Sequence, residues 1–310
     1  MDFSTLPDIF APVQACLGES PVWDKRTGTL FFIDITRGEI FAIQGNQPPL
    51  LIYRSVYRVG SLALTTRGDL IFTEDACVIL FCLSSGKITA RSNVASDGKS
   101  FRYNDSACDP QGRLVTGLMD EQHSVGSGSL HCFGNKLERN NLISDLGLPN
   151  GIAWCESGRS MYYVDSVARI IFKAGWCKER GQLFNPRVFA ETPEHLGRPD
   201  GIALDRADNL WVCQFNGGCI LQYSATGTLL LKVDLPVPRP TSCCFGGKGL
   251  SMLYITSAKF GMTEEEIRRF PQSGDIFQLS VRVPGLETHC FDDRLFHPQT
   301  FPTAPNTSLP

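Results

Sequence analysis

The sequence predicts an all-β fold, a six-bladed β-propeller with four-stranded antiparallel blades. A six-residue pattern recurs along the chain, and we call the first residue of each copy its anchor. The six anchors are Glu19, Gly60, Asn104, Asn150, Asp200 and Thr241. Successive anchors lie 41, 44, 46, 50 and 41 residues apart, a period typical of propeller blades rather than of helical or leucine-rich repeats. Six copies therefore predict six blades.

Each anchor pattern predicts the innermost strand of a blade, and two further strands follow it. A turn residue comes eight or nine places after each anchor and precedes an apolar run: Gly28, Gly68, Gly112, Gly158, Asp208 and Gly249. The runs predicted as second strands are 30–34, 70–73, 114–117, 161–165, 210–213 and 252–256. Those predicted as third strands are 39–43, 78–82, 129–133, 170–173, 219–223 and 275–279. Their apolar and β-branched content between turn residues is typical of short strands.

Two segments fall outside the repeat. Residues 8–13 precede the first anchor and are expected to form an outer strand that closes the ring against the last blade. Residues 263–269 predict a short helix, with Thr263 as its N-cap and acidic residues in its first turn.

The chain is expected to form one domain. Its 310 residues exceed the usual domain size, but closed all-β repeats often reach that length as a single unit. We place the propeller at residues 1–290. Residues 291–310 are rich in Pro, Thr and Asn, and we expect a loosely attached C-terminal tail there.

Composition narrows the possible partners and the compartment. The net charge is −3 and the basic residues are scattered, so nucleic acid is not expected as a partner. No run reaches the roughly 18 to 20 apolar residues of a membrane span, and the first 13 residues lack the features of a signal peptide. The protein is expected to be cytoplasmic, without membrane association. The oligomeric state is left open.

The twelve cysteines are expected to be reduced. Most fall inside strand-like runs, and no two have C-x-x-C spacing. Buried free cysteine is a common small apolar residue, and a cytoplasmic compartment keeps thiols reduced. The spacing also argues against a zinc ribbon or a thioredoxin-type centre.

Equivalent strands of a propeller point at one axis, so residues of the same register converge there. Glu19, Asn104, Asn150 and Asp200 are therefore expected to meet at one end of the channel. Carboxylate and amide oxygens are ligands of hard or borderline divalent cations. Any one of these residues could instead form a turn, but their shared register favours a common site.

Other acids and the histidines are given structural positions. Asp24, Asp109 and Asp205 recur five places after their anchors, ahead of turn residues, and are expected to form turns. All five histidines are expected at the surface or in loops, and none lies at an anchor. Because there is also no G-x-S-x-G motif, a serine-hydrolase triad has no support.

Several motifs resemble those of the gluconolactonase and senescence-marker-protein (regucalcin) family, over about residues 15 to 280. They are Gly18-Glu-Ser-Pro-Val-Trp23, Arg102-Tyr-Asn-Asp105, Gly128-Ser-Leu130, Leu148-Pro-Asn-Gly-Ile152, Arg198-Pro-Asp-Gly-Ile202 and Thr256-Ser-Ala-Lys-Phe-Gly-Met262. The resemblance implies a six-bladed propeller that hydrolyses sugar-acid lactones with one divalent metal.

The resemblance also assigns residues to roles. It implies metal ligation by Glu19, Asn150 and Asp200, and substrate contacts by Arg102 and Asn104. A further acid contacts the sugar in this family, and Glu121 matches it best, with Asp120 as the alternative. The metal could be Ca, Zn, Mn, Mg or Fe, because oxygen-rich sites accept several divalent ions. Neither the metal nor the sugar is specified by the sequence.

Lactone hydrolysis requires a polarised carbonyl, an activated water and a stabilised oxyanion, which a divalent metal and a nearby carboxylate can supply. Asp200 is our candidate for both ligand and general base. Two alternatives remain: a calcium- or ligand-binding propeller without turnover, and a metal-dependent phosphotriesterase or aryl-esterase. The polar Arg102, Asn104 and Glu121 argue against the latter, because an apolar organophosphate would leave them unpaired.

Overall fold

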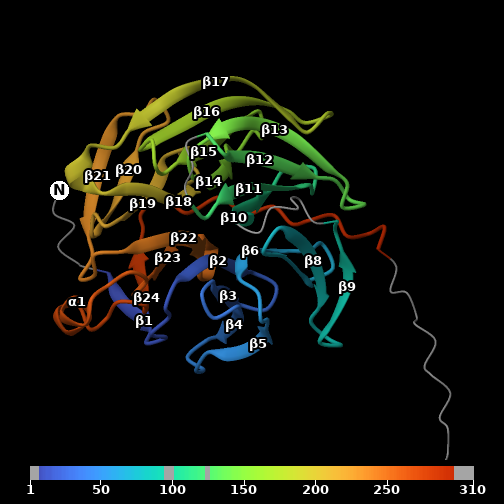
Figure 1. Ribbon diagram of the computed structural model, residues 1–310. Coiled ribbons are helices and arrows are strands. Elements are labelled where there is room, and N and C mark those ends of the chain that lie inside the picture. The colour runs from blue at the N-terminus through green and yellow to red at the C-terminus, as the bar shows by residue number, and fades with distance from the viewer. Residues whose placement is uncertain (1–6, 94–100, 123–125, 297–310) are drawn as a thin grey trace, which may run out of the picture.

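Six antiparallel sheets of four strands surround one central axis in the computed structural model, which describes residues 7–93, 101–122 and 126–296 (Figure 1). This architecture confirms the predicted six-bladed β-propeller. Within each sheet the strand that carries an anchor lies innermost. It is hydrogen-bonded to a neighbour on one side only, so its other edge faces the channel.

The first three blades follow the chain in order. Blade 1 contains β2 (Gly18–Asp24), β3 (Thr29–Asp34), β4 (Glu39–Gln44) and β5 (Leu50–Arg54). Blade 2 contains β6 (Val59–Leu64), β7 (Leu70–Glu74), β8 (Cys77–Cys82) and β9 (Lys87–Arg91). Blade 3 contains β10 (Phe101–Cys108), β11 (Leu114–Asp120), β12 (Gly128–Phe133) and β13 (Arg139–Leu146).

The other three blades complete the ring. Blade 4 contains β14 (Pro149–Trp154), β15 (Ser160–Asp165), β16 (Ile170–Cys177) and β17 (Gln182–Glu191). Blade 5 contains β18 (Arg198–Leu204), β19 (Leu210–Phe215), β20 (Cys219–Tyr223) and β21 (Leu229–Asp234). Blade 6 contains β22 (Pro240–Gly246), β23 (Met252–Ser257), β24 (Ile276–Ser280) and β1 (Asp8–Ala11).

The N-terminal strand closes the ring, as predicted. β1 pairs antiparallel with β24, with Asp8 opposite Gln278, so the first and last parts of the propeller share one sheet. The predicted helix is α1 (Glu264–Arg269), and its N-cap Thr263 forms a capping box with Glu266. Short 3-10 turns, η1 (Glu194–Leu196) and η2 (Lys248–Leu250), complete the described helical elements.

Every innermost strand is irregular close to its anchor. The register with the second strand shifts in all six blades, at 19–22, 59–61, 103–106, 150–152, 199–202 and 240–243. A β-bulge inserts an extra residue, bends the strand and re-aims nearby side chains. The recurring sequence pattern therefore encodes a recurring bulge at one end of the channel.

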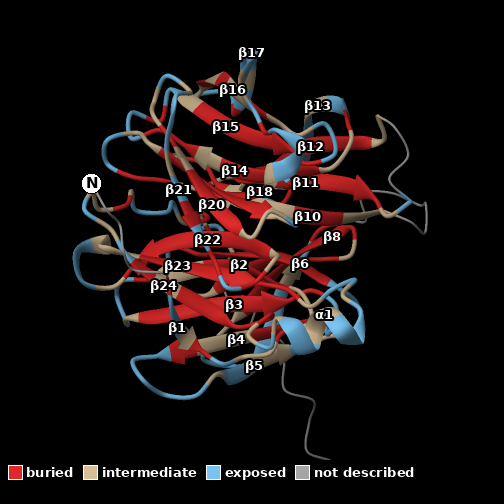
Figure 2. Ribbon diagram, turned by 90° about the vertical axis from the view of Figure 1, so that its left-hand side faces the viewer, coloured by how far each residue is buried: buried red, intermediate tan, exposed pale blue. Residues whose placement is uncertain are grey.

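The hydrophobic core is divided among the interfaces between blades. Buried apolar side chains of neighbouring blades form separate clusters, such as Ile33 with Leu62 and Phe72 of the next blade. The inner strands are mostly buried, and exposure rises towards the outer strands (Figure 2). Burying apolar area at each interface is the main force that holds such a ring together.

Ordered packing continues past residue 290, where we expected the propeller to end. Phe291 is fully buried, its N–H donates to the Leu64 carbonyl, and its carbonyl accepts from Thr66 N–H. Asp293 is also buried and accepts from Thr66 Oγ1 at 2.7 Å. Residues 291–296 therefore belong to the folded body. Residues 297–310 of the expected tail lie outside the described residues.

All twelve cysteines are free. None of the helices among the described residues is long and apolar enough to cross a membrane. The expectation for histidines is wrong for His131, which is buried on β12. Its Nδ1 pairs with Tyr103 Oη at 3.0 Å and its Nε2 with Ser129 Oγ at 3.1 Å, and burial lowers its pKa to about 4. His123 and His297 lie outside the described residues.

Candidate functional site

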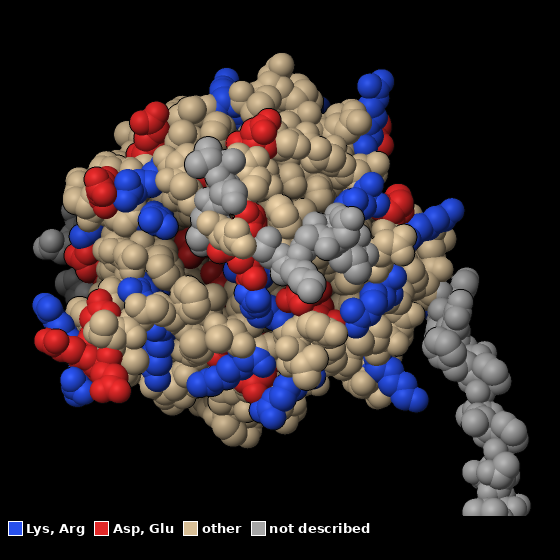
Figure 3. All heavy atoms as spheres, viewed as in Figure 1, with Lys and Arg blue, Asp and Glu red and all other residues tan. Residues whose placement is uncertain are grey.

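The predicted site residues meet at the bulged end of the inner strands. Acidic and basic side chains gather near the middle of the face seen in Figure 3. Close approach of the blades is possible there because Ser or Gly follows five of the six anchors. A Cβ on Gly151 would lie 2.5 Å from the Asp200 backbone oxygen, and Gly151 also has φ +35°, a conformation that disfavours side chains.

Asn150 and Asp200 are in direct contact. Both side chains are buried, and Asn150 Nδ2 donates a hydrogen bond to Asp200 Oδ1. Asn150 Nδ2 also lies 3.2 Å from Ser166 Oγ. Asn104 joins them, because its Nδ2 donates to the carbonyl of Pro149 at 3.2 Å. Three anchors from neighbouring blades are thus connected.

Glu19 lies close enough to these residues for the charge of Asp200 to act on it. It is buried, and its Oε2 accepts from Ser20 N–H at 2.9 Å. Burial raises the pKa of Glu19 well above its usual value, and the charge of Asp200 raises it further. The pKa of Asp200 is also well above normal, chiefly because of burial. Two buried acids near one another are costly to ionise without a cation.

Asp105 is a member of the site that the sequence reasoning did not single out as a candidate. Burial raises its pKa to about 6, and its charge raises the pKa values of both Glu19 and Asp200. The sequence did contain a pattern that points to Asp105. At the place directly after the anchor, the other five copies carry only Ser or Gly, and Asp105 alone is charged.

Arg102 lies beside the acids and connects them to Glu121. Its Nη1 donates to Asn104 Oδ1 at 2.8 Å, and its Nε lies 3.5 Å from Glu121 Oε1. Burial lowers the pKa of Arg102 to about 10, which leaves it charged at neutral pH. Arg58, from the loop between β5 and β6, also pairs with Glu121. Glu121, the better match for substrate contact, thus pairs with two arginines.

The donor set fits a divalent cation in its chemistry. Three acids have raised pKa values, and the charge of Arg102 offsets the rise only in part for Glu19 and Asp200. A further positive charge would therefore stabilise their ionised forms. Over the described residues, no three His, Cys, Asp or Glu side chains have the spacing of a metal site, but the expected ligand set contains only two such residues and one amide. Asn150 presents Nδ2 to Asp200, and a 180° rotation of its amide would present Oδ1 instead.

The fold and this site define a class of protein: a six-bladed propeller with an acid-lined channel mouth. The family model described as "SMP-30/Gluconolactonase/LRE-like region" matches residues 17–259. The chain belongs to this family.

Relatives and solved structures of similar fold agree with this assignment. Regucalcin from Oryctolagus cuniculus is 31% identical over 90% of this chain and 96% of its own. Human regucalcin is 30% identical with the same coverage. A calcium-binding protein, regucalcin, from Agrobacterium tumefaciens matches with TM-score 0.87 at 23% identity, covering 92% of this chain and 97% of its own. A luciferin-regenerating enzyme matches with TM-score 0.85 at 26% identity, covering 93% and 99%.

Proposed function

We propose that this protein is a metal-dependent lactonase that hydrolyses a sugar-acid lactone of the gluconolactone type to the open-chain acid. The observation that carries the proposal is the buried pair of acids, Glu19 and Asp200, beside Asn150. Arg102 and Asn104 offer hydrogen-bonding groups for hydroxyls directly next to them. Membership of the family supports a lactone as the substrate.

Glu19, Asn150 and Asp200 would hold one divalent cation. When bound, the cation supplies the positive charge that polarises the lactone carbonyl and assists deprotonation of the attacking water. Asp200 accepts the proton of that water, since it is the acid in contact with Asn150 and burial strengthens it as a base. The water oxygen bonds to the carbonyl carbon, the ring C–O bond breaks, and the leaving oxygen takes up the proton that Asp200 accepted. The carboxylic acid that forms then ionises and releases a proton near neutral pH.

Arg102, Asn104 and Glu121 would position the sugar. The Arg102 guanidinium presents donors in a planar fork, which suits two adjacent sugar oxygens. Glu121 accepts from Arg102 and Arg58, and it can equally accept from sugar hydroxyls. These residues act through orientation and not by forming bonds to the substrate.

The test is a panel of aldonolactones assayed by proton release near neutral pH. The protein is stripped with EDTA and reloaded separately with Ca, Zn, Mn, Mg and Fe. We expect no turnover without metal and recovery with at least one of the ions. Full activity in the metal-free protein would contradict the proposal.

Metal content separates the ligands from the substrate contacts. Glu19→Ala is expected to lose the metal, whereas Asn104→Ala is expected to retain it and to turn over slowly. Both are buried anchor residues, so Asn104→Ala is a matched control for loss of a buried polar group. Equal metal content in the two variants would contradict the role of Glu19.

A second candidate function is binding of calcium without turnover. It is favoured by the name regucalcin among the relatives and by the description of one structural neighbour as a calcium-binding protein. The same experiment separates the two functions. A non-catalytic protein would bind calcium and gain thermal stability by mass action, but no lactone in the panel would release protons.

A further inference from the structure

The channel holds a cavity that the proposed lactonase site does not use. Its volume is about 430 Å³, within the range of small-molecule sites. Its lining begins one residue after the anchors, at Ser20, Asp105 and Ser242, and continues to the opposite end of the inner strands. The lining does not include Glu19, Asn150 or Asp200. It is therefore a separate compartment that borders the site only through residues such as Asp105.

The width of this cavity is encoded in the repeat. The third place after each anchor carries a small or short side chain in all six copies: Val22, Ala63, Ala107, Ala153, Ala203 and Cys244. All six residues line the cavity. Larger residues at this register would narrow the channel, so the same pattern that builds the site also keeps the space beneath it open.

The lining combines apolar walls with neutral polar groups. Leu62, Ile152, Ile202 and Phe245 belong to the walls. The inner strands are hydrogen-bonded on one side only, so backbone N–H and C=O groups on their free edges face the channel. Two lining residues also have a buried side-chain atom without a hydrogen-bond partner in the described structure, Ser20 Oγ and Trp154 Nε1.

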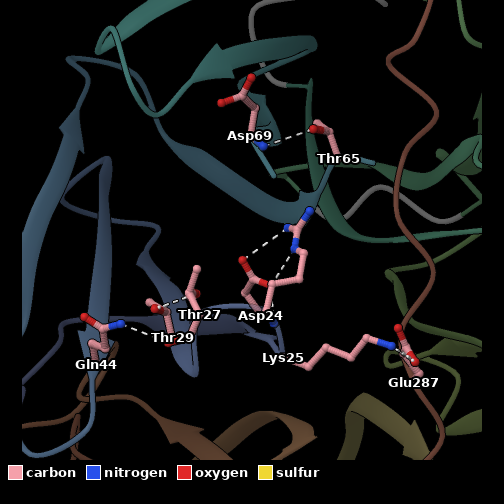
Figure 4. A network of polar contacts seen from close by, with 9 residues as sticks. Asp24, Lys25, Thr27, Thr29, Gln44, Thr65, Asp69 and Glu287 are labelled. Carbon is pink, nitrogen blue, oxygen red and sulfur yellow. Dashed lines mark hydrogen bonds and ion pairs between the residues drawn. The ribbon is translucent and has the colours of Figure 1, made fainter. Parts of the chain in front are cut away.

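The far end of the cavity is crossed by the segment 286–289. Leu286 N–H donates to the Leu204 carbonyl at 2.9 Å. Glu287 forms an ion pair with Lys25 at 2.6 Å (Figure 4). The charged side chains of the lining thus lie at its two ends. Asp105 lies near the proposed site, and the far end carries Glu156, Arg206 and Glu287.

We propose that this cavity is a second binding site, for a small, neutral, largely apolar molecule that carries a carbonyl oxygen. The apolar walls provide the affinity, and backbone N–H groups on the free strand edges donate to the carbonyl. A carboxylate would be disfavoured because acids lie at both ends. The proposal concerns binding alone, so it is independent of whether the protein hydrolyses lactones.

The test uses prodan, a neutral naphthyl ketone whose emission shifts to the blue in apolar surroundings. We expect saturable binding to the full-length protein. Ala153→Leu should weaken it by about tenfold or more, because the larger side chain fills the space. Ala168→Leu, the same change on an exposed turn, is the matched control and should bind prodan normally. Absence of saturable binding, or equal affinity in these two variants, would overturn the proposal.

A readout that does not depend on Ala153→Leu folding is the indole N–H resonance of Trp154. The chain has four tryptophans, and Trp154→Phe assigns the signal. Prodan in the cavity should move this resonance, because Trp154 is one of the lining residues. The indole resonance of Trp211, which is not a lining residue and whose Nε1 donates to Asp205, is the control and should stay in place. A Trp154 resonance that stays in place at saturation would place prodan elsewhere and overturn the assignment.

Charge selectivity completes the experiment. Neutral 2-acetylnaphthalene should displace prodan, and 2-naphthoate of similar size should displace it poorly. The opposite order would contradict a site for neutral molecules.

Discussion

Two sets of acids lie on or directly after the inner strands, and the sets differ in the hydrogen bonds that they accept. At the bulged end, Glu19, Asp105 and Asp200 lie near one another, and burial raises all three pKa values. Five places after the anchors, Asp24, Asp109 and Asp205 are buried as well. Each of these accepts several hydrogen bonds from its own turn and its surroundings, as the sequence predicted for turn-forming residues.

Asp205 shows the second arrangement most fully. Its Oδ1 accepts from Ala207 and Asn209 N–H, and its Oδ2 from the side chains of Asn209, Trp211 and Gln222. Asp200, by contrast, has one side-chain donor among the described residues, Asn150. The same residue type therefore stabilises the fold just past the end of β18 and is left short of donors near its start. A shortage of donors marks the end where a cation or substrate would bind.

The largest effect is expected for Asp200→Asn. The amide keeps an oxygen ligand of nearly the same size but cannot accept a proton, so turnover should fall by a factor of roughly 10² to 10⁴. Metal content, measured on the same sample, should remain detectable. A metal-loaded variant with close to the parent rate would show that Asp200 is only a ligand. Glu19, Asp105 and Glu121 would then be the next candidates for the base.

Asp205→Ala is expected to change stability rather than turnover. Removing an acid that accepts five hydrogen bonds leaves buried donors unpaired, which should lower the free energy of unfolding by roughly 3 to 5 kcal/mol. Asp200→Ala in metal-free protein is the matched comparison in the same blade, and it should cost much less. Urea unfolding of both variants measures the difference. Equal losses would remove the distinction between the two sets.

The sequence predicted the fold because the repeat records its physical cause. The anchor pattern encodes a bulge, the turn residue encodes the hairpin, and their constant separation gives the blade. The same register predicted that Asn104, Asn150 and Asp200 converge, because equivalent positions of successive blades face one axis. Their roles as ligands or substrate contacts remain proposals.

The parts that the sequence reasoning missed are those without a repeat. Arg58 is on a loop, and no periodic pattern indicates that it pairs with Glu121. Phe291 lies in a Pro- and Thr-rich stretch, and its burial depends on a bridge to Thr65 of a distant blade. His131 was assigned by residue type, although its place on a strand beside Tyr103 decides its burial. Such contacts depend on tertiary packing, which local propensity does not specify.

A smaller effect is expected for Arg102→Lys. An ammonium keeps the charge but cannot reproduce the planar fork, so turnover should fall by about tenfold to a hundredfold through lost orientation. Arg113→Lys is the control at the other end of the channel, since Arg113 pairs with Asp109 through Nε and Nη2. It should lower the melting temperature and leave KM unchanged. Similar kinetics for the two variants would argue against a substrate contact by Arg102.

The smallest effect concerns pH and the metal-free protein. An acid whose pKa is raised on folding stabilises the folded state most below its unfolded pKa, and this contribution is lost as pH rises through the folded value. For Asp105 the ordinary pKa is 3.8 and the folded value is about 6, so the melting temperature of metal-free protein should fall between about pH 4 and 6 because of this group. Asp105→Asn should flatten that slope, because an amide does not titrate. Asp24→Asn should not, since the pKa of Asp24 is lowered by its hydrogen bonds to Arg26. Differential scanning calorimetry across this range, with and without a saturating divalent metal, measures the effect. If metal-free wild type and Asp105→Asn show the same pH dependence, burial at the bulged end does not raise the pKa of Asp105 as described.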